Sequence, residues 1–424
     1  MSQNSTPSPE ANQPDAEASD PACQRLGKAE ASASEKTRNQ ILPMDLEEYI
    51  PVFHWPKDTS RFSFVRAERT DSAYLNDLYN RVFQQQRPLT HFEWKYWANP
   101  AGPPYGVIAK DRADGRALAA AFGQRRRAWI RGRAVPANLM CEISSDPSAR
   151  GGGVAFKGVM HAIGIGLNDE AGVLWSYGGQ SSDEAIAVGS RWLGFREAFT
   201  LTIWEMRLSL EPALRARLGG AGAAVARLAD PIFRATWRDA SQNYDCVELQ
   251  DFGPEFDALW ERYRDRYALA FFRDAATLKW RWKDNPVPGH RILLARKAAS
   301  GEPVGWIIWR EWKSASHQIA TVLDLWAGGE EAVIAALVDA ARRRAAAAGC
   351  RFLRYGVKDG SPEMRALQKL GHGRASPHDR PDRVIVTPMP GSLHDETEEE
   401  FAVLRVVVHG ENWYYAQGDS DFYD

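Results

Sequence analysis

The residues best suited to chemistry form a glycine-rich stretch between a candidate strand and a candidate helix. It reads Asp-Pro-Ser-Ala-Arg-Gly-Gly-Gly-Val-Ala over residues 146–155, and it contains Arg150 and the consecutive glycines Gly151, Gly152 and Gly153. Glycine lets a ligand approach the backbone closely. The first N–H groups of a helix have no partner within the helix and lie at the positive end of its dipole, so they bind anions. The stretch is therefore predicted to bind phosphate.

The elements around this stretch are those that would position a phosphate-binding loop. An apolar strand is expected over residues 139–144, and a helix is expected over about 154–167. A second apolar strand over 173–178 and a short helix over 182–192 follow, and the triplet Leu-Gly-Phe closes this part at 193–195. The expected order is strand, loop, helix, strand, helix, with the glycines at the start of the first helix.

Spacing within the loop separates the known kinds of phosphate-binding loop. The Walker pattern is absent, and Gly151-x-Gly153 is not followed by a third glycine at the Rossmann spacing. The pattern Arg150-x-x-Gly153-x-Ala155 resembles the Gln/Arg-x-x-Gly-x-Gly/Ala signature of the GNAT superfamily of acyl-coenzyme A N-acyltransferases. In that superfamily the loop holds the pyrophosphate of acetyl-coenzyme A. The alternative is a surface glycine turn that precedes a helix and binds nothing.

The resemblance extends over about residues 61–210 and implies both a fold and a chemistry. It implies a sheet in which two strands splay apart, so that the pantetheine arm of acetyl-coenzyme A, the cosubstrate, hydrogen-bonds to main chain in the gap. It implies an enzyme that moves an acetyl group from acetyl-coenzyme A to an amine. The residues expected to bind the cosubstrate are Ser144, Ser145, Arg150, Gly151, Gly152, Gly153, Val154 and Ala155.

Acyl transfer to an amine needs a base that takes the amine proton and donors that stabilise the oxyanion and thiolate. In the family that this chain resembles, the base is commonly a carboxylate on the strand before the loop, where Glu142 stands. Period-two alternation places Glu142 opposite the apolar Ile143 and so in the acceptor cleft; a glutamate at the surface is the alternative. The acid is commonly a tyrosine four residues before the glycine of Gly-Phe. That place holds Ser190, so water or Tyr177 would have to serve.

The chain repeats part of itself. Trp94 corresponds to Trp280, and Asn99 corresponds to Asn285 at the same offset of 186 residues, and an apolar strand and a glycine turn follow in both copies. Self-similarity of this kind predicts two copies of one domain. Because the aromatic residues recur in both copies, we expect them to pack in the interior rather than to stack on a ligand.

The second copy differs where the phosphates would bind. Its strand over 321–326 leads into Ala-Gly-Gly-Glu-Glu at 327–331, with no arginine and with the carboxylates Glu330 and Glu331. These charges would repel a pyrophosphate. The expected fold class is therefore α/β (α+β), with two tandem GNAT-like domains, each a mixed, mostly antiparallel sheet with flanking helices, of which the second is degenerate.

The composition of the chain indicates terminal tails in addition to the two domains. The first residues are rich in Ser, Pro, Ala, Glu and Gln and lack periodic apolar residues, so they are expected to be disordered. A strand-like run of valines over 403–408 and the aromatic residues after it indicate that the last part docks on the body. The expected parts are a tail over 1–45, the cofactor-binding domain over 60–207, a helical connector over 208–241, the degenerate domain over 242–395 and a C-terminal tail over 396–424.

Bulk properties agree with a two-domain enzyme. The chain has 424 residues and a formal net charge of −2, so no nucleic-acid partner is expected. Its four cysteines form no Cys-x-x-Cys pair, which predicts neither a metal site nor a disulfide framework and fits a reducing cytoplasm. No apolar run reaches the roughly 18 residues of a membrane span.

The acceptor is the part of the prediction that the residues determine least. We expect a small-molecule amine, such as an amino sugar or another small metabolite. The alternative is a non-catalytic acyl-coenzyme A sensor whose second domain contacts a macromolecular partner, and the serine at position 190 motivates it. The oligomeric state is not predicted.

Overall fold

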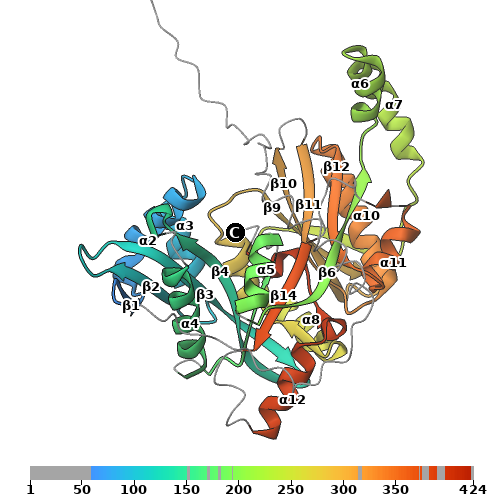
Figure 1. Ribbon diagram of the computed structural model, residues 1–424. Coiled ribbons are helices and arrows are strands. Elements are labelled where there is room, and N and C mark those ends of the chain that lie inside the picture. The colour runs from blue at the N-terminus through green and yellow to red at the C-terminus, as the bar shows by residue number, and fades with distance from the viewer. Residues whose placement is uncertain are drawn as a thin grey trace, which may run out of the picture. The chain divides into compact units, whose positions relative to one another are not determined.

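One sheet runs through both halves of the chain in a computed structural model of the protein (Figure 1). The structure describes residues 59–149, 153–169, 172–179, 183–192, 194–313, 318–371, 373–374, 382–388 and 397–421. In this part of the chain the sheet's main path runs in the order β1 (Phe62–Arg66), β2 (Tyr105–Asp111), β3 (Ala117–Ile130), β4 (Arg133–Ser145), β5 (Trp175–Gly179), β14 (Asp382–Pro388), β6 (Arg196–Arg207), β12 (Phe352–Lys358), β11 (Gln318–Trp326), β10 (Pro303–Lys313), β9 (His290–Lys297) and β7 (Tyr244–Leu249). Three short strands join it from the side: β8 (Leu269–Phe271), β13 (Gly373–Arg374) and β15 (Trp413–Tyr414).

The second half of the chain repeats the order of elements of the first. The helices of the first half are α2 (Ser72–Phe83), α3 (Leu89–Phe92), α4 (Val154–Asp169) and α5 (Asp183–Trp192), and their counterparts are α8 (Pro254–Tyr263), α9 (Ala275–Leu278), α10 (Glu331–Ala347) and α11 (Pro362–Lys369). Both α3 and α9 continue into one π-helical turn, over Glu93–Trp97 and Lys279–Lys283. The predicted mixed, mostly antiparallel sheet with flanking helices is confirmed, as is the order of strand, loop, helix, strand, helix.

The two halves share strands, which the pattern of elements did not predict. β14, from the second half, lies between β5 and β6 of the first and is antiparallel to both. β6 is long enough to pair with β14 over its first residues and with β12 over its last. The described residues accordingly belong to one compact unit. The division into domains over 60–207 and 242–395 stays a prediction about ancestry and function.

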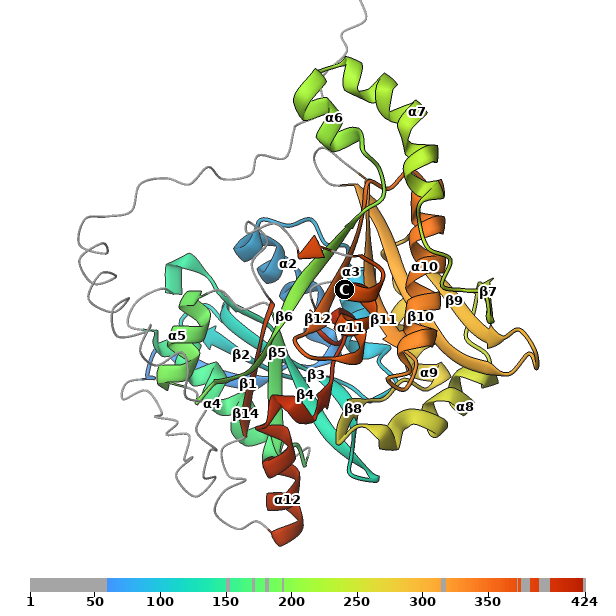
Figure 2. The same cartoon turned by 90° about the vertical axis from the view of Figure 1, so that its right-hand side faces the viewer.

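Helices on the sheet bury three apolar clusters. In the first half, α4 presents Val159, Met160 and Ile163 to the sheet, at the spacing of one helix face. Gly158 lets α4 approach β1, since a Cβ there would lie 2.1 Å from the ring of Phe64. In the second half, α10 covers one face of the sheet and α8 the other, and Figure 2 shows α10 and α8 on different sides of β9 and β10.

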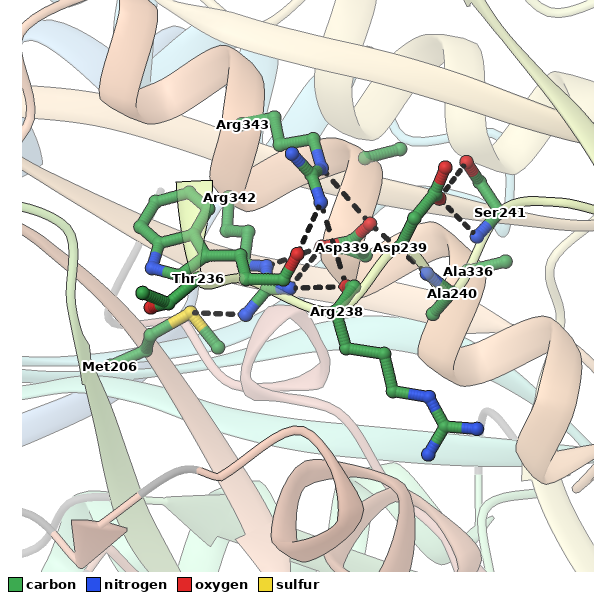
Figure 3. A network of polar contacts seen from close by, with 12 residues as sticks. Met206, Thr236, Arg238, Asp239, Ala240, Ser241, Ala336, Asp339, Arg342 and Arg343 are labelled. Carbon is green, nitrogen blue, oxygen red and sulfur yellow. Dashed lines mark hydrogen bonds and ion pairs between the residues drawn. The ribbon is translucent and has the colours of Figure 1, made fainter. Parts of the chain in front are cut away.

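Between the halves, residues 208–241 form two helices, α6 (Glu211–Leu218) and α7 (Ala221–Ala235). The chain after α7 is fixed to α10 by the polar network in Figure 3. Asp339 of α10 is fully buried and pairs with both Arg342 and Arg343, and it accepts a hydrogen bond from the backbone N–H of Ala240 at 3.3 Å. Arg342 also donates to the carbonyl of Arg238 at 2.9 Å. The buried charges of Asp339 and Arg342 therefore both have partners.

The strand expected over 403–408 is wrong, because residues 403–407 belong to a helix, α12 (Glu398–Val407), and Val408 is its C-cap. Thr397 and Glu400 form a capping box, in which each side chain accepts a hydrogen bond from the other residue's backbone N–H. The helix buries Val403, Leu404 and Val407 on one face. Capping and packing outweigh the preference of valine for strands.

Candidate functional site

β4 and β5 are parallel neighbours that part after two residue pairs. Asn138 pairs with Ser176 and Leu139 with Tyr177, and within the described residues no later residue of β4 pairs with β5. β5 is instead held on its other side by β14. The edge of β4 beyond Leu139 that faces β5 is therefore open to hydrogen bonds from something other than the sheet.

The candidate phosphate loop follows directly from this open edge. β4 ends at Ser145, a short 3₁₀ turn covers Pro147–Ala149, and α4 begins at Val154. Gly153 precedes α4 with φ +67°, a left-handed conformation that favours glycine. Among the described residues, a Cβ on Gly153 would meet only the side chain of Lys157, at 3.8 Å. Lys157 lies on the first turn of α4, beside Gly153.

Some of the predicted cofactor-binding residues lie within the described part of the chain and others lie outside it. Arg150, Gly151 and Gly152 lie outside the described residues. The others lie at the end of β4 or the start of α4: Ser144, Ser145, Gly153, Val154 and Ala155. Ser144 and Ala155 are buried, and Ser145 and Val154 are half-buried. The adjacency expected of these five residues is present, while their contacts with a cofactor stay a prediction.

Glu142 lies at a bulge in β4, so the expected alternation is wrong there. Ser144 pairs with Ala120 and Cys141 with Phe122, which leaves two residues of β4 opposite one residue of β3. Glu142 has φ +48°, as the extra residue of such a bulge does. The extra residue resets the alternation, so Met140 and Ile143, which strict alternation would place on opposite faces, both pack against the same apolar cluster as α4.

The carboxylate of Glu142 is buried between two cations. Arg87 binds it with both terminal guanidinium nitrogens, one of them at 3.0 Å, and Lys95 Nζ lies 3.1 Å from Oε1. The Lys95 ammonium also lies 3.6 Å from Asp421. Burial opposes ionisation, but the charges and hydrogen bonds of Lys95 and Arg87 outweigh it and hold the pKa of Glu142 at about 2. Glu142 is therefore ionised at neutral pH and is a weak base.

The two residues expected to supply an acid lie apart. Tyr177 is buried on β5, its ring stacks on Phe271 at 4.5 Å, and its hydroxyl donates to the carbonyl of Asp419 at 3.0 Å. Burial raises the pKa of Tyr177 far above its usual value. Ser190 is exposed on α5. Within the described residues, no hydrogen bond joins either of them to Glu142.

The second half contains a cluster that matches this one. Arg273 and Arg281 stand 186 residues after Arg87 and Lys95, the offset that also relates the repeated tryptophans. Arg273 pairs with Asp324 of β11 at 3.0 Å and with Asp419 at 2.5 Å. We did not single out Arg87, Lys95 or their counterparts from the sequence. The shared offset was the signal that would have found them.

The C-terminal segment fills the second half where β11 and β12 part. Gln417 Oε1 accepts a hydrogen bond from the backbone N–H of Gly356 at 3.0 Å, on the strand that corresponds to β5. Gly418 lies so close to Trp282 and to the carbonyl of Leu323 that a Cβ would be 2.4 Å and 2.8 Å from them. A strand edge that an acyl-coenzyme A arm would need is therefore already used by the chain itself.

The loop before α10 is also unlike the loop before α4. Gly328 packs against the ring of Tyr263, where a Cβ would come within 2.5 Å. Glu330 pairs with Arg266 at 2.6 Å, and Glu331 pairs with Arg365 and Lys369 of α11. The start of α10 thus carries carboxylates that already have cationic partners.

Other kinds of site find little support in the described part of the chain. It contains no group of three or more His, Cys, Asp or Glu side chains placed to hold a metal ion. None of its helices is both long and apolar enough to span a bilayer.

Comparisons with known proteins match by fold and not by sequence. No protein-family model and no curated protein matches the chain. A GCN5-related N-acetyltransferase from Anabaena variabilis has a TM-score of 0.55 and 13% identity, covering 77% of this chain and 72% of that one. A GCN5-related N-acetyltransferase from Kribbella flavida has a TM-score of 0.53 and 14% identity, over 78% and 73%. N-myristoyltransferase from Saccharomyces cerevisiae, with bound myristoyl-CoA, has a TM-score of 0.52 and 10% identity, over 81% and 86%.

Sequence identities this low support a shared fold but no shared substrate or activity. The long, mostly antiparallel sheet with its flanking helices agrees with these structures. The chain therefore has the fold of the GNAT N-acyltransferases.

Proposed function

We propose that the protein moves an acetyl group from acetyl-coenzyme A to the amino group of a small molecule, such as an amino sugar. The observation that carries the proposal is the parting of β4 from β5 directly before the N-terminus of α4. A similar structure, N-myristoyltransferase, has been solved with myristoyl-CoA, which is itself an acyl-coenzyme A. Bound acetyl-coenzyme A would supply the activated acyl group.

The residues of the first half fit an acyl-coenzyme A. The open edge of β4 offers main-chain groups to the amides of a pantetheine arm. The first N–H groups of α4, the left-handed Gly153 and the ammonium of Lys157 suit a pyrophosphate. In the proposal Arg150, Gly151 and Gly152 complete this loop, with Ser144, Ser145, Val154 and Ala155 around it.

The contacts of Glu142 weigh against direct proton abstraction by this residue. A carboxylate with a pKa of about 2 that already accepts from Arg87 and Lys95 gains little by taking another proton. We propose that Glu142 orders these two cations beside the bulge, that the amine attacks in its neutral form, and that water relays the proton from its nitrogen to the departing thiolate. Water is also the simplest proton source for the thiolate, since Tyr177 is engaged with Asp419 and Ser190 faces solvent.

A second function fits the same observations. A domain that binds acyl-coenzyme A without transferring the acyl group would need the open edge and the loop, but no free base. The tight pairing of Glu142 favours this sensor function, because a carboxylate held by two cations is a poor base. The free thiols of Cys141, Cys246 and Cys350 support a reducing compartment, which we propose is the cytoplasm for either function.

One assay separates the two functions. Release of free thiol from acetyl-coenzyme A is measured with and without a panel of small amines, including amino sugars. Thermal unfolding is followed in parallel, because a ligand bound only by the native state stabilises it by about 2.7 kcal/mol at a hundredfold excess over its Kd. Amine-dependent release supports the transferase. Thermal protection without amine-dependent release supports the sensor, and neither effect at millimolar acetyl-coenzyme A would reject both.

A further inference from the structure

A cavity of about 400 Å³ lies in the second half, at the end of β12. Its walls come from three places: the chain before β8, the end of β12 with the start of α11, and the segment that leads into β15. Volumes of this order are typical of small-molecule sites. The exposed residues Asp359 and Glu411 also line the cavity, so the cavity opens to solvent. It is separate from the open edge of β4 in the first half.

Three tyrosine hydroxyls in the wall, those of Tyr267, Tyr414 and Tyr415, have no hydrogen-bond partner among the described residues. The hydroxyls of Tyr267 and Tyr414 are both buried and unsatisfied, and Tyr414 as a whole is only 6% exposed. Their rings lie 4.8 Å apart. The groups that act electrostatically on the Tyr414 hydroxyl include Tyr355 and Glu363, which line the same cavity, and the paired Asp324 and Arg273 behind it. Buried hydroxyls in native proteins are nearly always satisfied, so these hydroxyls indicate a missing partner.

Glu363 adds a buried carboxyl to this wall. It is 7% exposed, and among the described residues no lysine or arginine forms an ion pair with it. Burial raises the pKa of Glu363, although hydrogen bonds from its own backbone N–H and from Ser361, and the charges of Lys358 and Arg365, act in the opposite direction. A buried carboxylate without a counter-charge is costly, and a bound cation would remove that cost.

The cations in the wall are already used by the protein. Lys358 Nζ lies 2.9 Å, 3.3 Å and 2.7 Å from the carbonyls of Gly410, Glu411 and Trp413, which satisfies its three N–H groups. Arg266 binds the carbonyl of Gly328 and pairs with Glu330.

An anion would find little to bind in this cavity. The lining carboxylates Asp359, Glu363 and Glu411 outnumber the lining cations Arg266 and Lys358. The start of α11 is capped by Ser361, whose hydroxyl accepts from the N–H of Met364 at 3.1 Å. The groups left to bind a ligand are therefore the carboxylate of Glu363, the tyrosine hydroxyls and the aromatic rings.

We propose that this cavity binds the protonated amino group of a small organic amine, through the carboxylate of Glu363 and the hydroxyls of Tyr267 and Tyr414. An ammonium group donates three hydrogen bonds and is attracted to the faces of aromatic rings. This site does not depend on the acyl transfer proposed for the first half. It gives the second half a ligand of its own in place of a cofactor.

The test uses the full chain and three probes of one shape: n-butylamine, 1-butanol and butyrate. Calorimetric titration should show saturable binding of butylamine, and weaker or no binding of the alcohol and the acid. Glu363→Gln and Tyr414→Phe should each weaken butylamine binding about tenfold or more, as expected for losing a hydrogen bond to a charged group. Glu398→Gln, an exposed change on α12, is the matched control and should leave binding unchanged.

Tyr267→Phe provides a second measurement if Glu363→Gln does not fold, and acetyl-coenzyme A affinity is measured for every variant. Unchanged acetyl-coenzyme A binding with lost butylamine binding supports the proposal. The proposal is overturned if butylamine does not bind, if Glu363→Gln and Tyr414→Phe bind it as the wild type does, or if butyrate or inorganic phosphate binds more tightly. If the wild-type chain does not bind acetyl-coenzyme A, the function proposed for the first half is overturned instead.

Discussion

Trp94 and Trp280 bind each other in the same way from the two halves of the chain. The indole Nε1 of Trp94 donates to the carbonyl of Trp280 at 2.8 Å, and that of Trp280 donates to the carbonyl of Trp94 at 3.0 Å. Their rings stack with centroids 5.6 Å apart. Equivalent residues of a repeat that contact each other reciprocally lie on a local two-fold axis, as at the interface of a symmetric dimer.

This reciprocity predicts equal effects of equivalent substitutions. Trp94→Phe removes one indole donor and leaves the buried carbonyl of Trp280 without its partner, and Trp280→Phe does the same in reverse. Each should lower the free energy of unfolding by about 1–3 kcal/mol. Urea unfolding measures both. A cost for one and no cost for the other would show that the contact is not symmetric in energy.

Arg87, Lys95 and Glu142 predict how stability depends on acid. The pKa of Glu142 is about 2 in the folded state and about 4.5 in the unfolded one, so its ionisation stabilises the fold above pH 4.5. That contribution, on the order of 3 kcal/mol, is lost as the pH falls from about 4.5 toward 2. Glu142→Gln should be less stable at pH 7 and should show a flatter fall over this range. Parallel curves for wild type and variant would contradict the assignment.

Two substitutions of Gly153 distinguish the effect of a negative charge from the effect of side-chain shape in the proposed pyrophosphate loop. Asn and Asp have the same shape and both tolerate left-handed backbone, which the φ of +67° requires. Among the described residues a Cβ at this position meets only Lys157, at an ordinary contact distance of 3.8 Å, so both variants should fold. Gly153→Asp should abolish acetyl-coenzyme A binding by repelling phosphate, while Gly153→Asn should only weaken it. Equal affinities measured by calorimetry would show that no phosphate lies near this residue.

Gly418 tests whether the C-terminal segment supports the second half. In Gly418→Ala the new methyl group would overlap Trp282 and the carbonyl of Leu323, so the free energy of unfolding should fall by about 1–3 kcal/mol. Gly220→Ala is the matched control, because nothing lies within 4 Å of its Cβ. Thermal unfolding compares the two. Similar midpoints would mean that the segment is loosely held.

The sequence predicted the order of helices and strands far better than it predicted which strands lie side by side in the sheet. The strand, loop, helix order and the repeat follow from periodicity and from the common offset of Trp94 and Trp280. The insertion of β14 between β5 and β6 does not, because a strand's pattern reports which face is buried and not which strand lies beside it.

The candidate site shows the same limit. A bulge resets the alternation at Glu142. The sequence did not indicate the bulge, because a glutamate and not a glycine takes the left-handed conformation there. The partners of Glu142 come from positions 87 and 95, far along the chain, and only folding brings them together. The pairing that lowers the pKa of Glu142 could therefore not be predicted from its own strand.

The number of acetyl-coenzyme A molecules bound per chain tests the central claim most directly. The open edge of β4 and the loop before α4 occur in the first half, while the C-terminal segment and the carboxylates before α10 occupy the same places in the second. Calorimetric titration of the full chain should give one site. Two equal sites would contradict the division of labour between the halves, and no binding at millimolar concentration would contradict the function itself.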